Sequence, residues 1–249
     1  MIRYIILAAF CFIIACKEKP PQQLTAQQII DKSIEVSGGL LLQQSEVSFL
    51  FRDMSFERTN TKQGKVLKRT VNKDGTLIHD VYSPSGFERY VNGDLTQIAD
   101  SMARKYQNSI NSVHYFAYLP EGLNDAAAHK KLIGETTIKD KLYYQIEVTF
   151  DEEDGGEDFD DIYIYWIDKE TFKPDYLAYQ FSVNKGGIRF REAFNERIIN
   201  GIRFVDYKNY GLDGNLSVYD AEEKYINQEL PLKSTITLKE INVNRGSYN

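Results

Sequence analysis

The sequence is poor in cysteine. Its two cysteines, Cys11 and Cys16, both lie near the start of a chain of 249 residues. The part that is expected to fold, residues 25–249, therefore contains no thiol. This excludes disulfide bonds, thiolate catalysis and cysteine metal sites from the folded domain.

Sequence motifs of common enzymes are missing too. The chain has no GxGxxG or GxxxxGK phosphate loop, no GxSxG nucleophile turn and no HExxH zinc helix. Its three histidines are scattered, and only His114 stands at the exit of an expected helix beside a run of apolar and aromatic residues. His114 could act as a base in a hydrolase or lyase, but a lone histidine is more often structural. Whether the protein is an enzyme stays open, and the balance favours a protein that is not.

Basic clusters are absent as well. The formal net charge is -6, and no lysine-rich or arginine-rich segment offers the positive face that nucleic acid requires. Eight of the eleven residues in 151–161 are carboxylates, and without them the charge would be +2. This run could bind calcium through Asp154, Asp158 and Asp160, although its spacing is not that of an EF-hand. A solvated hairpin tip explains the acidic run equally well, and the run could also be a surface that contacts protein partners.

The N-terminus carries a short apolar run rather than a membrane span, which would need about 20 apolar residues. Residues 1–15 end in Ile13-Ile14-Ala15 before Cys16, which resembles the lipobox of bacterial lipoproteins. The resemblance implies a signal peptide cleaved before Cys16, acyl chains on that residue and attachment to a membrane. Residues 16–24 are mostly charged, polar or proline, which predicts a tether. Because Lys17 rather than aspartate follows Cys16, we expect the outer membrane, on its periplasmic or its surface side.

The densest strand pattern covers residues 162–210. Four runs there alternate with period two and are separated by short turns, which predicts an antiparallel β-meander. The third and fourth runs meet at Asn200-Gly201, a dipeptide that suits a two-residue type I′ turn. Other hairpin turns are expected at residues 72–75, 92–94 and 139–140. Single long strands are expected over residues 46–56 and 234–243.

Helical patterns are few. Thr25 begins the first as an N-cap residue in a capping box. Helices are expected over residues 25–38, 100–113, 126–130 and 221–225. The strands and helices together predict a mainly β fold of the α+β class. We expect one curved antiparallel sheet of about 11–12 strands, forming an open half-barrel with two or three helices on its concave side. Residues 25–249 would form this single domain.

Aromatic residues make up 13% of the chain and concentrate in the expected strands. Most should be core, but a curved sheet with rings on its concave side can also enclose an apolar cavity. The candidate ligand-lining residues are His114, Tyr115, Phe116, Trp166, Tyr179, Phe181 and Phe190. Arg189 and Arg191 share the less apolar face of the third meander strand. They could hold an anionic head group by bidentate contacts, or pair with surface carboxylates across the strands.

Five stretches also carry a family resemblance: residues 112–116, 119–125, 163–166, 175–179 and 186–191. They resemble an uncharacterised family of lipoproteins from Bacteroidota-type bacteria, over nearly the whole mature chain. The resemblance implies a half-barrel similar to the lipoprotein-sorting LolA-like proteins and to LppX, and it supplies no catalytic residues. Some relatives are labelled deoxyribose-phosphate aldolase. That label implies a TIM barrel of alternating βα units, which the strand-after-strand pattern contradicts.

The sequence and the resemblance together predict a membrane-anchored envelope lipoprotein that binds a lipid or another apolar ligand without catalysis. The alternatives are an envelope scaffold that acts through residues 151–161, and an uncharacterised envelope hydrolase or lyase. We expect no cofactor, no nucleic-acid partner and a monomer. The identity of the ligand stays open.

Overall fold

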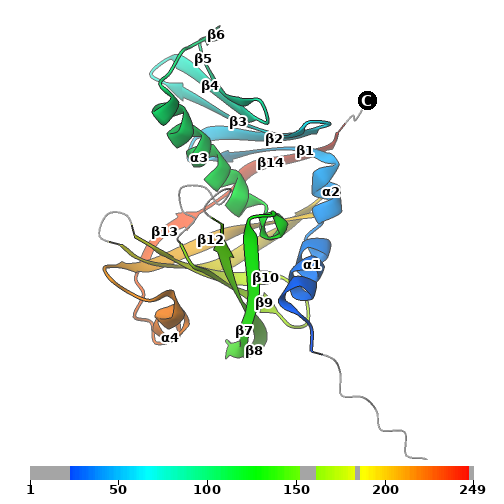
Figure 1. Cartoon of the computed structure of the whole chain (residues 1–249), viewed down its shortest axis with the longest axis vertical. Helices are drawn as coiled ribbons and strands as arrows, with labels where there is room; N and C mark the ends of the chain where they lie inside the picture. Colours follow the sequence, from blue (N-terminus) through cyan, green and yellow to red (C-terminus); the bar gives the residue numbers. More distant parts are fainter. Residues whose placement is uncertain (1–22, 152–160, 183–185, 247–249) are drawn as a thin grey trace, which may run out of the picture.

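The computed structural model describes residues 23–151, 161–182 and 186–246. Within these residues the chain forms two open, seven-stranded sheets in which all pairs are antiparallel (Figure 1). Sheet A has the order β14-β1-β2-β3-β4-β5-β6 and sheet B the order β13-β12-β11-β10-β9-β8-β7. The expected open antiparallel architecture is confirmed, and a parallel βα barrel is excluded.

The strands follow one another mostly as hairpins. Sheet A consists of β1 (Ser45–Phe51), β2 (Met54–Thr61), β3 (Gly64–Lys73), β4 (Thr76–Ser83), β5 (Gly86–Val91), β6 (Asp94–Leu95) and β14 (Lys239–Arg245). Sheet B consists of β7 (Ala128–Ile138), β8 (Lys141–Phe150), β9 (Tyr163–Asp168), β10 (Pro174–Phe181), β11 (Gly187–Ile199), β12 (Ile202–Asp213) and β13 (Leu232–Ile236). The meander predicted for residues 162–210 is therefore β9 to β12.

The described residues hold fourteen strands in two sheets, where the sequence predicts about 11–12 in one. One reason is a turn at Arg52-Asp53, whose φ angles of 50° and 60° split the expected strand 46–56 into β1 and β2. The other is that residues 234–243 form two strands instead of one. β13 ends in sheet B, and β14 begins in sheet A three residues later.

A buried carboxylate holds this crossover between the sheets. Asp206 is 1% exposed, and its Oδ1 accepts hydrogen bonds from the Leu238 N–H at 3.0 Å and from Arg197 at 2.6 Å. Arg197 in turn donates to the Leu238 carbonyl at 2.9 Å. The backbone that leaves sheet B is thereby bonded on both sides, which satisfies groups that could not face water.

The helices are α1 (Ala26–Val36), α2 (Gly39–Gln43), α3 (Asp100–Ala117) and α4 (Ala221–Ile226), with 3₁₀ turns at Glu121–Asn124 and Val218–Asp220. The predicted capping box is present: the Thr25 hydroxyl accepts from the Gln28 N–H, and the Gln28 side chain accepts from the Thr25 N–H. The prediction of a helix over residues 126–130 is wrong. That segment enters β7, where pairing with β8 satisfies its backbone.

Helix α3 packs on sheet A and faces sheet B (Figure 1). A buried ion cluster supports it: Asp80 is fully buried and accepts from Arg69 at 2.6 Å and from Arg89 at 2.6 Å. Arg69 also donates to Ser109 of α3 at 3.1 Å, and the Arg89 guanidinium lies 3.6 Å from the ring centre of Tyr106. Removing one partner would leave buried charges unpaired, so this cluster fixes the helix on the sheet.

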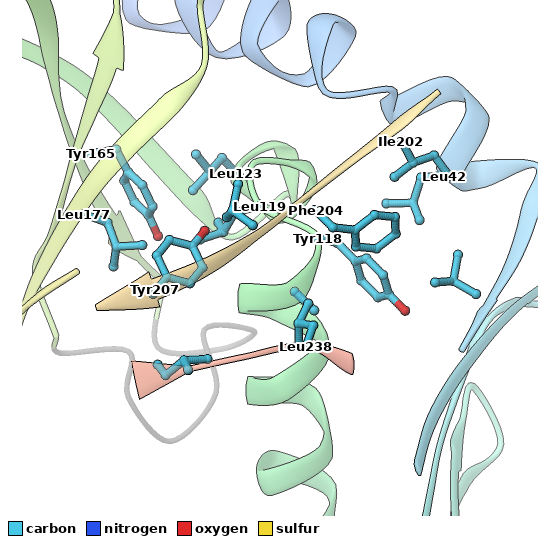
Figure 2. Close-up of a cluster of buried hydrophobic side chains, with 14 of the residues drawn as sticks. Leu42, Tyr118, Leu119, Leu123, Tyr165, Leu177, Ile202, Phe204, Tyr207 and Leu238 are labelled. Atoms are coloured by element: carbon cyan, nitrogen blue, oxygen red, sulfur yellow. The ribbon is translucent and has the colours of Figure 1, made fainter. Parts of the chain in front are cut away.

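Sheet B is covered on both faces by apolar side chains. We call the face directed at α3 the inner face; it carries Tyr165, Leu177 and Tyr207, which gather near Leu119 in Figure 2. The outer face carries a second core that includes Trp166, and α4 packs over it. The sequence predicts two or three helices on the concave side of the sheet, whereas α4 covers the outer face of sheet B.

Candidate ligand-binding cavity

A cavity of about 670 Å³ lies between α3 and the inner face of sheet B. This volume is within the range of about 300–1,000 Å³ that is usual for small-molecule sites. Its wall is mainly aromatic and aliphatic. The apolar lining comprises Phe51, Val113, Tyr115, Phe116, Leu119, Ala127, Phe150, Tyr163, Tyr165, Leu177, Tyr179, Phe181 and Ile236.

Strand geometry decides which meander residues reach this cavity. Successive side chains of a strand point to opposite faces, so Tyr165 lines the cavity and Trp166 does not. The Trp166 indole donates to Glu222 of α4 at 2.5 Å, and Phe190 stacks on Tyr225 with ring centres 4.3 Å apart. Contrary to the expectation, Trp166 and Phe190 belong to the outer core.

Four of the candidate ligand-lining residues do meet in the cavity wall: Tyr115 and Phe116 from α3, and Tyr179 and Phe181 from β10. The cavity wall also contains residues that were not among the candidates, including Tyr163, Tyr165 and Leu177. Cross-strand register could have found them, because Tyr163 pairs with Tyr179 and Tyr165 pairs with Leu177 on one face.

His114 lies outside the cavity wall. Its ring is 2% exposed and packs between Phe49, Phe56 and Tyr118. Burial lowers its pKa to about 3, and Nε2 lies 3.4 Å from the Lys68 carbonyl, to which it can donate. A neutral imidazole enclosed by three rings suits a structural role and removes the reason to make His114 a general base.

The two candidate arginines both line the cavity but differ in their partners. Arg189 donates from Nη2 to Asp213 at 2.8 Å and from Nη1 to the Ile188 carbonyl at 2.9 Å. Arg191 makes one hydrogen bond, from Nη2 to the Tyr179 hydroxyl at 3.2 Å. Within the described residues no carboxylate lies within 4.0 Å of the Arg191 guanidinium.

Burial keeps two phenols of the cavity neutral, those of Tyr115 and Tyr165. Burial raises the pKa of Tyr115 and the pKa of Tyr165 far above the ordinary value. The Tyr115 hydroxyl is buried and has no hydrogen-bond partner of good geometry in the described part of the chain. The hydroxyls of these two tyrosines are therefore polar groups without negative charge.

Two carboxylates also border the cavity. Asp125 lies 3.7 Å from Lys65, and burial raises its pKa. Asp161 is 7% exposed. The wall thus combines aromatic and aliphatic side chains with arginines and carboxylates.

Other predicted sites lie beyond the described residues. Cys16 and the calcium candidates Asp154, Asp158 and Asp160 fall outside them. Among the residues that are described, no group of three or more histidine, cysteine or acidic side chains could hold a metal ion. In the same part of the chain, no helix combines the length and the apolar character that a membrane crossing requires.

Three solved structures resemble this one. A LolA superfamily protein from Nitrosomonas europaea is 12% identical, with 89% of this chain and 92% of that chain covered and a TM-score of 0.43. A DUF1329 family protein from Desulfovibrio piger is 11% identical, with 88% and 91% covered and a TM-score of 0.40. The Mycobacterium tuberculosis lipoprotein LppX is 10% identical, with 64% and 88% covered and a TM-score of 0.29.

Comparison with curated proteins found no match. One family model, by contrast, matches most of the sequence, from residue 42 to residue 240. This span runs from α2 into β14 and includes α3 and the strands that form the cavity. The chain belongs to the family of unknown function DUF6503.

Proposed function

We propose that this protein binds a lipid or another apolar ligand in the cavity between α3 and sheet B. The observation that carries the proposal is the cavity itself: about 670 Å³ of space with a largely aromatic wall. The aromatic and aliphatic groups that line this space contact water when it is empty, and an apolar ligand would remove them from water.

We also propose that the protein works as a lipoprotein of the cell envelope. The support is the lipobox at Cys16 and the polar tether of residues 16–24, which would hold the folded domain close to a membrane. Acyl chains on Cys16 would place the cavity near a pool of lipids. A monomer with no cofactor is enough for this role.

Native mass spectrometry tests the proposal. A chain from Lys17 to Asn249 keeps every described helix and strand. Purified without detergent, it should carry extra mass that organic solvent extracts as lipid. Val113→Trp places an indole in the cavity and should abolish this mass. Met102→Trp is the matched control, because Met102 is on the same helix, 39% exposed and outside the cavity.

A protein that carries no extra mass after purification and binds none of a panel of added lipids would contradict the proposal. Loss of the extra mass in Met102→Trp as well as in Val113→Trp would mean that the ligand binds elsewhere. A catalytic role for His114 has less support, because its ring is enclosed and its pKa is about 3.

A further inference from the structure

Arg191 has no counter-ion in the described part of the chain. Its one hydrogen bond goes to the Tyr179 hydroxyl, its Nε is buried without a partner, and its Nη1 has no acceptor among the described residues. Arg189, two positions along the same strand, is by contrast tied to Asp213 and to two carbonyls. The two arginines on this strand face therefore differ in how many of their N–H donors already have an acceptor.

The charge of Arg191 lies within the aromatic part of the cavity. Its guanidinium carbon is 5.2 Å from the ring centre of Tyr179 and 5.6 Å from that of Phe116. Its positive charge also opposes the rise in pKa that burial causes at Tyr165 and Tyr207. Cation–π contacts offset only part of the cost of desolvating a guanidinium.

We propose that Arg191 is the receptor for an oxyanion at the head of an acyl chain, a carboxylate or a phosphate. The inference rests on the proposed function and names the ligand class. Nη1 and Nη2 offer two parallel N–H groups, which match the two oxygens of such a head group. The chain of the ligand would then lie along the inner face of sheet B, against Leu177 and Tyr165.

The polar residues near the cavity agree with this orientation. The Asp125 carboxylate would repel an anionic head group. Arg52 also borders the cavity but is exposed, so water would screen an ion pair with it more than one with the partly buried Arg191. Arg189 has its charge compensated by Asp213 and offers less to a second anion. One oxyanion and one apolar chain therefore fit the charges of the wall better than a neutral lipid does.

Competition binding separates this inference from the proposed function. The chain from Lys17 to Asn249 is loaded with a fluorescent, uncharged acyl probe, which is then displaced by palmitate or by cetyl alcohol. Palmitate should displace the probe about 10- to 100-fold better, as expected for a charge-assisted hydrogen bond. Arg191→Gln should remove that preference, whereas the matched control Arg189→Gln should retain most of it. Phosphatidylglycerol in place of palmitate tests whether a phosphate serves as the head group.

The outcomes are distinct. If palmitate and cetyl alcohol displace the probe equally and Arg191→Gln changes nothing, the inference fails while the proposed function stands. If neither ligand nor the probe binds, the proposed function fails. Arg191→Lys keeps the charge without the planar fork and should retain an intermediate preference, which guards against a folding defect in Arg191→Gln. Equal loss of preference in Arg189→Gln and Arg191→Gln would also overturn the assignment.

Discussion

Replacing Phe190 by alanine should destabilise the fold and leave ligand binding unchanged, whereas replacing Tyr179 by alanine should weaken ligand binding and destabilise the fold less. The two residues lie on neighbouring strands, β11 and β10, but on opposite faces of sheet B. Phe190 is fully buried, and its ring centre lies 5.2 Å from that of Trp166 and 4.3 Å from that of Tyr225. Tyr179 borders the cavity and is only partly buried.

The expected magnitudes follow from burial. Phe190→Ala should cost about 3–5 kcal/mol of unfolding free energy, the usual range for a fully buried ring. Tyr179→Ala should cost about 1–2 kcal/mol, because part of the ring already faces an open space. Urea unfolding followed by the fluorescence of Trp166, the only tryptophan, and by circular dichroism gives both values. Displacement of the acyl probe gives the effect on binding.

Two results for Phe190→Ala would contradict the assignment of the strand faces. A Phe190→Ala variant that loses less than about 1 kcal/mol would show that the outer core under α4 is not packed as described. A variant that keeps its stability but loses ligand binding would place Phe190 in the cavity. Either result would refute the assignment of Tyr165, Tyr179 and Arg191 to the inner face.

Three further predictions concern the scaffold. Asp80→Ala should cost about 3–5 kcal/mol in urea unfolding, because it leaves Arg69 and Arg89 partly buried without their shared carboxylate; a cost near zero would contradict the role of this cluster. His114 has a folded-state pKa of about 3, below its unfolded value. The stability it contributes is therefore complete above the unfolded pKa and is lost as the pH falls, by about 2 kcal/mol between pH 7 and pH 5. His114→Phe should flatten that pH dependence, and equal slopes for both proteins would contradict the burial of His114. Gly201→Ala should cost about 1–2 kcal/mol, because φ is +83° and a Cβ would lie 2.5 Å from Leu41 Cδ1; an unchanged urea midpoint would contradict it.

Turn chemistry explains how much of the fold was predictable. Asn200-Gly201, Asn92-Gly93 and Lys139-Asp140 each join the two strands expected of them. These turns need positive φ angles, and asparagine, aspartate and glycine adopt them at low cost. Arg52-Asp53 adopts angles similar to those of Lys139-Asp140, but the apolar run continues past it through Met54 and Phe56, so the pattern did not indicate that β1 ends there.

The candidate site was predictable only in part. The meander strands are apolar on both faces, so period two groups the side chains correctly but does not say which group faces the cavity. The position of α4 decides which face is covered, because this helix packs over Trp166 and Phe190. With only six residues, α4 has too weak a sequence pattern to predict where it packs. The pairing of Asp213 with Arg189 rather than Arg191 likewise depends on the register of β11 with β12.

Methyl NMR during a palmitate titration tests most directly whether a ligand occupies the cavity. The methyl groups of Val113, Leu119 and Leu177 line it, whereas those of Ala178, Ile188 and Val218 lie in the outer core. We predict saturable shifts confined to the first group and absent in Val113→Trp at its remaining cavity methyls. Shifts in the outer group, or none in either group at saturating palmitate, would contradict ligand binding on the inner face of sheet B.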